Sequence, residues 1–207
     1  MSPAGRPRKF DEDRVLNAAM EAFWEHGYEA TSLSQLREAT GLSSASLYGA
    51  FGSKAALFAR AVEHYIEGPG RVTEISADGQ LGADALEMML LDSIRMQSDA
   101  SHPVGCLVAL SAVVGTASED SDSAREAVKL RRQADRDRIT ACVRAGIADG
   151  SLDRDVEPLS ASAAVHTFLL GVSTQLRDGV DAEQLKGAAS LLVAAMRASR
   201  GDHPVTS

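Results

Sequence analysis

The chain has 207 residues, of which 44% are hydrophobic and 4% aromatic, and its formal net charge is −8. This length accommodates one large domain or two small ones, with a core made mainly of Ala, Leu, Val and Met. Two cysteines exclude a disulfide framework. The sequence shows neither an apolar signal region nor an apolar run that could cross a bilayer, so we expect a soluble, cytoplasmic protein.

The negative charge is distributed unevenly along the chain. The first 60 residues contain equal numbers of basic and acidic side chains, so the entire net negative charge lies in the rest of the chain. An acidic protein is usually a poor ligand for nucleic acid, because neutralisation of phosphates supplies much of the affinity. The neutral N-terminal part weakens this objection without removing it.

Residues 1–10, MSPAGRPRKF, are expected to form a flexible basic arm. One glycine and two prolines disfavour a helix there, while Arg6, Arg8 and Lys9 supply the positive charge. The arm is either a disordered terminus with solvated charges or a segment that contacts DNA phosphates or the minor groove, as other basic N-terminal arms do.

The first helix is predicted from residue 11 to about residue 26. Asp11 is a favourable N-cap, Gly27 is a stop signal, and apolar side chains recur between them every three or four residues. We expect three helices to pack around a small N-terminal core. Its predicted members are Trp24, Tyr28, Leu33, Leu36, Leu47 and Phe51.

Residues 31–51 contain the signals of two short helices joined by a tight turn. Ser32 and Gln35 form a capping-box pattern, Gly41 suits a left-handed helix end, and Ser43 is a second N-cap. This pattern is typical of a helix-turn-helix, whose second helix presents its N-terminal residues to the major groove. It also occurs in all-α proteins that bind no nucleic acid, so the local pattern leaves both alternatives open.

Further helices are predicted along the rest of the chain. A helix capped at residue 53 ends at a Gly-Pro-Gly break, and residues 68–82 are expected to form a linker. Residues 118–122 are predicted to be an acidic loop, and the mixed charges of residues 131–138 to form a solvated face with salt bridges. The remaining helices are expected at about 83–98, from 102 through an apolar segment, and at about 123–148, 157–177 and 181–199.

No segment alternates polar and apolar residues as a half-buried strand does. The expected fold is therefore all-α, with about nine helices. Residues 11–66 would form an N-terminal three-helix domain with the helix-turn-helix motif at about 31–51, and residues 67–207 a larger C-terminal helical domain.

No motif predicts catalysis or a cofactor, since the sequence contains no glycine-rich phosphate loop, GxSxG or HExxH. His102 and Cys106 lie four residues apart, but a stable metal site needs more ligands than this pair supplies. We therefore expect no enzyme activity, no metal and no cofactor. His166 lies within an apolar helix, either as a satisfied core or pocket histidine or as a ligand contact.

Cys106 admits two interpretations. Pro103 is predicted to open a helix, which would place Cys106 near its N-terminus, where the helix dipole lowers the pKa of a thiol and raises its reactivity. Alternatively, Cys106 is an inert buried thiol, as most free cysteines are. Cys142, within an apolar stripe, is expected to be inert.

The N-terminal 65 residues resemble the DNA-binding domain of TetR-family transcriptional regulators. The resemblance covers about a third of the chain and rests on the segments FWEHGYEATSL and LREATGLSSASLYGAFGSKAALF. One departure is Gly49-Ala50, because many family members have an aromatic residue or histidine just before the phenylalanine. The residues that match the family pattern in order and spacing are Gly41, Ser43, Leu47, Tyr48, Phe51, Ser53 and Lys54.

The resemblance implies two kinds of DNA contact. Tyr48, Lys54 and Ser32 would bind phosphates, and Ser44, Ala45 and Ser46 of the recognition helix would face the bases. Ser43, which opens that helix, and the arm residues Arg8 and Lys9 complete the residues expected to contact DNA.

The resemblance also implies a homodimeric, ligand-responsive repressor that a small molecule releases from a palindromic, double-stranded operator. The dimer would form through the last two helices, which are rich in Ala, Ser and Gly, although packing within the chain explains these small residues equally well. Two alternatives remain, namely a repressor that senses oxidants or electrophiles through Cys106, and an all-α enzyme or ligand carrier without operator binding. The residues expected to contact the effector are Met89, Cys106, Leu110 and His166.

Overall fold

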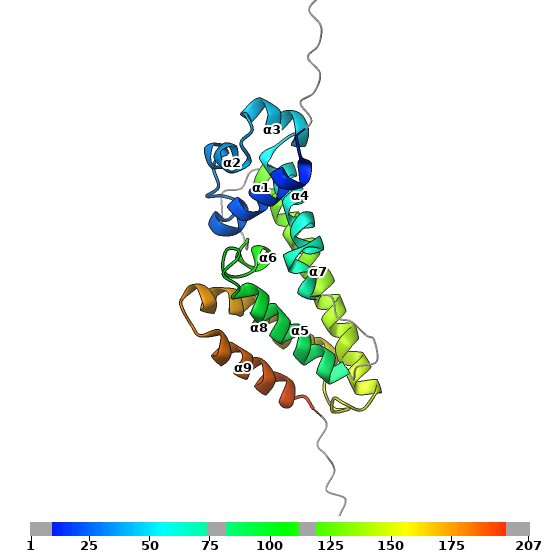
Figure 1. Ribbon diagram of the computed structural model, residues 1–207. Helices are drawn as coiled ribbons and strands as arrows, with labels where there is room; N and C mark the ends of the chain where they lie inside the picture. Colours follow the sequence, from blue (N-terminus) through cyan, green and yellow to red (C-terminus); the bar gives the residue numbers. More distant parts are fainter. Residues whose placement is uncertain (1–9, 74–81, 112–118, 198–207) are drawn as a thin grey trace, which may run out of the picture.

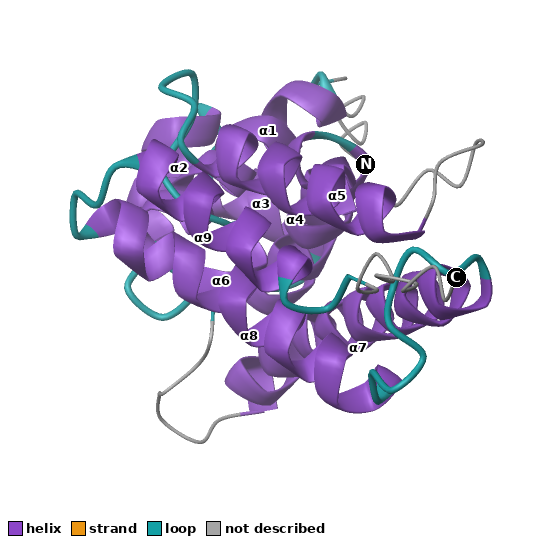
Figure 2. Cartoon of the chain, turned by 90° about the horizontal axis from the view of Figure 1, so that it is seen from below, coloured by secondary structure: helices purple, strands orange, loops and turns teal. Residues whose placement is uncertain are grey.

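The computed structural model describes residues 10–73, 82–111 and 119–197. Within these ranges the chain forms nine α-helices, one short 3-10 helix and no strand, which confirms the predicted all-α fold (Figure 1, Figure 2). None of these helices is long and apolar enough to span a membrane. The elements are α1 (Glu12–His26), α2 (Leu33–Thr40), α3 (Ser44–Phe51), α4 (Lys54–Glu67), η1 (Pro69–Thr73), α5 (Gly82–Gln97), α6 (Leu107–Leu110), α7 (Glu119–Ala148), α8 (Pro158–Arg177) and α9 (Ala182–Ala194).

The first four helices begin and end where the sequence predicts. Asp11 caps α1 by accepting a hydrogen bond from the backbone N–H of Arg14. Both hydrogen bonds of the capping box at Ser32 are present, and Gly41 ends α2 in the left-handed conformation, with φ 71° and ψ 12°. Ser43 and Ser53 cap α3 and α4 in the same way as Asp11 caps α1.

An aromatic cluster fills the N-terminal domain, where α1 packs against α2 and α4. The rings of Phe23 and Phe58 meet edge to face with their centroids 5.1 Å apart, and Tyr28 lies against both. Trp24 contacts Tyr65 of α4 in the same geometry, at 4.8 Å. The predicted core is therefore confirmed, and α4 contributes a second set of rings to it.

α7 connects the two parts of the molecule. Its 30 residues run beside α4 in the N-terminal domain and beside α5 and α8 in the C-terminal domain (Figure 1). α9 packs on α5 and α8. The completely buried aliphatic side chains of this second core include Leu86, Leu90, Ile94, Val143 and Val165.

The segment after Pro103 does not form the predicted helix. Gly105 has φ 96°, and its N–H donates to the carbonyl of Gln97 at 2.9 Å. The next N–H, that of Cys106, donates to the hydroxyl of Ser173 at 3.2 Å. Because these groups bond to other helices, α6 starts only at residue 107, and residues 112–118 lie outside the described residues.

The prediction of an acidic loop at residues 118–122 is also wrong from residue 119 onward, because α7 begins at that residue. Acidic residues are favourable in the first turn of a helix, where they interact with its positive end. Farther along α7, the predicted solvated face is partly buried. The side chains of Arg131 and Asp135 are only 8% and 13% exposed, and Asp135 also binds Arg138 at 2.6 Å.

The last helix is shorter than predicted. α9 ends at Ala194 rather than near residue 199, and residues 198–207 lie outside the described part. The carbonyl of Met196 accepts a hydrogen bond from the N–H of Asp153 at 2.9 Å. Arg197 bonds to Asp84 and Glu87, each at 2.8 Å. These contacts turn the chain toward α5 and end the helix.

A junction joins α1 to the C-terminal domain. The indole N–H of Trp24 donates to the carbonyl of Gly105 at 3.1 Å, and the indole stacks on His102 at 4.4 Å between ring centroids. Arg177, the last residue of α8, donates to the carbonyls of Trp24 at 2.9 Å and Glu25 at 3.3 Å, and to that of Val104 at 3.1 Å. Arg177 therefore caps the C-terminal end of α1 from a helix about 150 residues away in sequence.

Candidate nucleic-acid interface

The helix α3 has one side in the core and the other in solvent. Leu47 and Phe51, one turn apart, are buried. Since an α-helix repeats about every 3.6 residues, Ala45 and Gly49 lie on the opposite side, and both are exposed. Tyr48 flanks this outward side and is 44% exposed. The outward side of α3 therefore consists of small uncharged residues beside one aromatic ring.

The predicted serine contacts differ in their surroundings. The Ser43 hydroxyl accepts a hydrogen bond from the N–H of Ser46 at 3.1 Å and lies 3.0 Å from the Ser46 hydroxyl. Ser32 donates to the side chain of Gln35 at 2.7 Å and accepts from its N–H at 3.2 Å. Ser43 and Ser32 thus hold the helix ends, while Ser44 is half-buried toward the core and is the least suited to contact bases.

Tyr48 and Lys54, the two predicted phosphate ligands, lie on either side of the α3–α4 turn. The Tyr48 hydroxyl forms no hydrogen bond with any residue in the described ranges, so it is available to an external acceptor. The ammonium of Lys54 lies over the ring of Tyr28, 4.5 Å from its centroid, and 3.4 Å from the carbonyl oxygen of Glu29. These contacts hold the charge of Lys54 at the start of α4.

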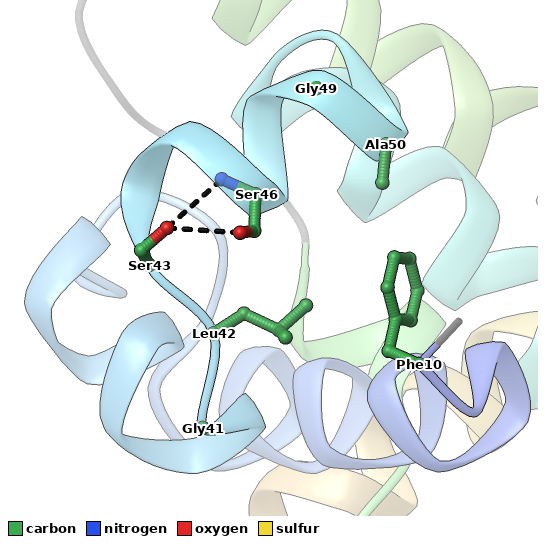
Figure 3. Close-up of a pocket in the computed structure, with 7 residues that line it drawn as sticks. All are labelled: Phe10, Gly41, Leu42, Ser43, Ser46, Gly49 and Ala50. Atoms are coloured by element: carbon green, nitrogen blue, oxygen red, sulfur yellow. Dashed lines mark hydrogen bonds between the residues drawn. The ribbon is translucent and has the colours of Figure 1, made fainter. Parts of the chain in front are cut away.

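A hollow of about 510 Å³ lies beside the outward side of α3 (Figure 3). Figure 3 shows Phe10 at the start of α1 on one side of it and Ala50 of α3 on the other, with Leu42 at its base. The Phe10 ring packs on Phe51, with 6.3 Å between centroids. The seven residues that line the hollow are Phe10, Gly41, Leu42, Ser43, Ser46, Gly49 and Ala50.

The structure adds residues that the sequence did not single out. Arg37 is exposed in the last turn of α2 and lines a second hollow that includes Ser43. Arg37 is the one basic residue between residues 31 and 51, so its charge is the sequence signal that could have identified it. Phe10 carries no such signal, because the hollow that it lines together with Gly49 forms only in the fold. Arg8 and Lys9 lie outside the described residues.

The four predicted effector contacts do not form one group. Met89 is buried in the core of the C-terminal domain, whereas Cys106 and Leu110 pack against the core that includes the N-terminal domain. His166 is buried, and burial together with the nearby charge of Arg136 lowers its pKa. The sequence placed these residues on plausible helices but could not bring them to a common site.

Polar groups gather instead around the buried part of α7. Asp135 lies close enough to affect the pKa values of Tyr65, Cys106 and His166, which come from three different parts of the chain. Burial raises the pKa of the Tyr65 hydroxyl, which donates to the sulfur of Met96 at 3.9 Å, and the nearby Cys106 thiol raises this pKa further. Tyr65, Cys106, Asp135 and His166 are called the polar cluster below, and the buried Arg131, which pairs with Asp135 at 3.1 Å, adds a positive charge beside it.

Cys106 is not the activated thiol that the predicted helix would have produced. It precedes the four-residue α6 and does not lie within a longer helix. Burial raises the pKa of the Cys106 thiol, although the Tyr65 hydroxyl and two backbone N–H groups partly oppose this effect. The thiol is therefore protonated at neutral pH, which argues against the electrophile-sensing alternative because the thiolate is the reactive form.

We expect iodoacetamide to alkylate native Cys106 at pH 7.5 more slowly than the urea-unfolded chain, since a raised pKa leaves less thiolate. The measurement is mass spectrometry over time in a Cys142→Ser background. This substitution removes a second thiol, whose pKa burial raises to about 11. Equal rates in the native and unfolded protein would show that Cys106 is reactive after all.

Comparisons with known proteins agree with the helix-turn-helix interpretation. The family model described as "Bacterial regulatory proteins, tetR family" matches residues 15–61, which run from α1 into α4. The HTH-type transcriptional repressor ComR of Escherichia coli strain K12 is 28% identical over 183 residues, covering 87% of this chain and 86% of ComR.

Solved structures extend the similarity to the C-terminal domain. A cysteine mutant of the TetR family transcriptional regulator CifR, complexed with 26-base-pair double-strand operator DNA, has a TM-score of 0.84 and 34% identity. The match covers 92% of this chain and 99% of that one. The reduced form of Escherichia coli NemR, at 23% identity and a TM-score of 0.75, shares the fold.

Proposed function

The chain belongs to the TetR family of bacterial transcriptional regulators, and from this premise we propose that two copies of it repress transcription from one palindromic operator. It is a DNA-binding repressor rather than an enzyme, as are the curated relatives it resembles. Such a regulator acts where the bacterial chromosome lies, so we place it in the cytoplasm.

The observation that supports this function is the outward side of α3. Ala45, Ser46 and Gly49 are exposed and small, so the helix can enter a major groove without steric conflict. Tyr48 and Lys54 stand beside it with groups suited to phosphate oxygens. Phosphate contacts would fix the position of α3, and the small residues would contact base edges.

The test of this function is selection from random DNA. The purified protein is incubated with a pool of random duplexes at moderate salt, and the retained fragments are sequenced. We expect an inverted repeat whose half-sites are about one helical turn apart, because a twofold-symmetric dimer binds a twofold-symmetric site. Retention of fragments without a common sequence would contradict the proposal.

The faces of α8 and α9 support the dimer. Residues 158–176 and 187–196 contain no Asp, Glu, Lys or Arg, and Leu159 and Leu191 are 62% and 73% exposed. Gly171 and Gly187 lie within these helices, and a Cβ at either would meet nothing within 4 Å. An uncharged helix surface with small residues lets a second copy approach closely. Figure 1 places both helices at the end of the molecule away from α3.

Replacing Leu191 by Arg should therefore convert the dimer to a monomer of about 21.8 kDa, because each copy would bring a charge into an apolar interface. Light scattering after size-exclusion chromatography measures the mass, and operator binding should be lost with the dimer. Leu130→Arg is the matched control, since Leu130 is 61% exposed on α7. A dimeric Leu191→Arg protein would refute this interface.

We also propose that a small molecule releases the operator by binding against the polar cluster of Tyr65, Cys106, Asp135 and His166. Its residues come from α4, α7, α8 and the segment just before α6, and Arg177 joins α8 to the end of α1. A ligand acts only through its different affinities for the DNA-bound and released arrangements. A fluorescence-polarisation screen of small polar compounds against the protein–DNA complex tests this. If a releasing compound is as potent on the His166→Leu variant as on the wild type, its binding site lies elsewhere.

A further inference from the structure

We propose that α3 recognises a thymine in each operator half-site through its C5 methyl group, which enters the hollow beside Gly49 and Ala50. This inference rests on the proposed operator binding and adds a base preference to it. The hollow is the one lined by Phe10, Leu42, Ser43 and Ser46 as well as by these two residues (Figure 3).

The fold itself does not require glycine at position 49. Gly49 is not among the glycines with positive φ, and a Cβ built on it meets nothing within 4 Å. Glycine is nevertheless the least favourable residue inside a helix apart from proline. Replacing Gly49 by a larger residue would therefore stabilise α3 in the free protein, so the reason for a glycine lies in what approaches from outside.

Gly49 is exposed on the outward side of α3. It lies opposite the buried Leu47 and Phe51, and its neighbours on the outward side are Ala45 and Ser46. With no side chain at position 49, the helix backbone itself forms this part of the surface. A base edge can therefore come nearer to α3 at Gly49 than at a position with a larger side chain.

The chemistry of the hollow favours an apolar group over a phosphate. None of its seven lining residues is charged, and carbon atoms of Phe10, Leu42 and Ala50 form much of its wall. Its two hydroxyls, those of Ser43 and Ser46, already lie 3.0 Å from each other. The C5 methyl of thymine is the apolar group that base pairs present in the major groove, and small apolar side chains contact it.

The experiment removes this methyl group and nothing else. Thymines of the selected duplex are replaced one at a time by deoxyuridine, and the affinity of the wild-type protein is measured by fluorescence anisotropy. We expect one position in each half-site where binding weakens about fourfold, the change that corresponds to one buried methyl group. Wild-type binding that is unaffected at every thymine would overturn the inference while leaving operator binding intact.

A second variant locates the contact at the hollow. Gly49→Leu fills it and should weaken binding about tenfold, while raising or preserving the melting temperature, since leucine favours helix. Its affinity should no longer distinguish thymine from deoxyuridine at the sensitive position. Ala145→Leu, at an exposed position near the end of α7, is the matched control. Undiminished sensitivity to deoxyuridine in Gly49→Leu would overturn the assignment. Failure of the wild type to bind any duplex would instead refute the proposed function.

Discussion

Replacing Tyr48 by Phe and Lys54 by Ala together should weaken operator binding at least about 100-fold at moderate salt. In each subunit the first change removes one hydroxyl from an exposed ring, and the second removes one ammonium that lies 4.5 Å from the Tyr28 centroid. Both groups are proposed to contact charged phosphates, and a hydrogen bond to a charged group contributes about 1.5–3 kcal/mol. The two contacts of one subunit therefore contribute at least about 3 kcal/mol, and the dimer carries two such sets.

The salt dependence of binding separates the two contributions. Each lysine that neutralises a phosphate adds about 0.9 to the slope of log affinity against log salt, so a dimer without Lys54 should lose about two units of slope. The Tyr48→Phe change alone should leave the slope unchanged. Lys129→Ala removes the same charge from an exposed position on α7 and serves as the control. Unchanged affinity in the double variant would mean that α3 and α4 do not contact the DNA backbone.

Replacing Trp24 by Ala should lower the free energy of unfolding by about 3–5 kcal/mol and the melting temperature by about 10 °C. The indole is completely buried, stacks on His102 and meets Tyr65 edge to face. Its removal leaves a cavity where the N-terminal domain joins the C-terminal domain. It also leaves the carbonyl of Gly105 without the N–H that lies 3.1 Å away. Urea titration followed by circular dichroism measures the loss.

Trp24→Phe isolates the hydrogen bond from the packing. This variant keeps an aromatic ring at the junction but loses the indole N–H, so we expect a cost of about 1–2 kcal/mol. If Trp24→Ala were no less stable than Trp24→Phe, the junction would depend on the hydrogen bond rather than on the buried ring. The urea titration needs no operator DNA, so stability and binding can be measured separately.

The helix-turn-helix could be predicted because its determinants are local. The capping box of Ser32 and Gln35 and the left-handed Gly41 lie within a few residues of the helix ends that they define. The apolar residues Leu47 and Phe51 then orient α3, so the outward position of Tyr48 also follows from spacing. Short-range chemistry sufficed for this part of the site.

The predictions that were wrong concern segments whose local structure is determined by distant parts of the chain. The backbone at Gly105 and Cys106 bonds to Gln97 and Ser173, so residues 103–106 do not continue as helix. Arg131 appeared solvated because its neighbours in sequence are charged, yet α7 packs that face against α4. The hollow at Gly49 depends on Phe10, 39 positions earlier. A pattern within one helix carries no information about such partners.

The central claim is that two copies each place one α3 in the major groove of the same operator. Hydroxyl-radical footprinting of the selected duplex tests it most directly. We predict two protected windows on one face of the DNA, with centres about 10–10.5 base pairs apart, that disappear together in the Leu191→Arg protein. A single protected window, or two windows that persist when the protein is monomeric, would contradict this account.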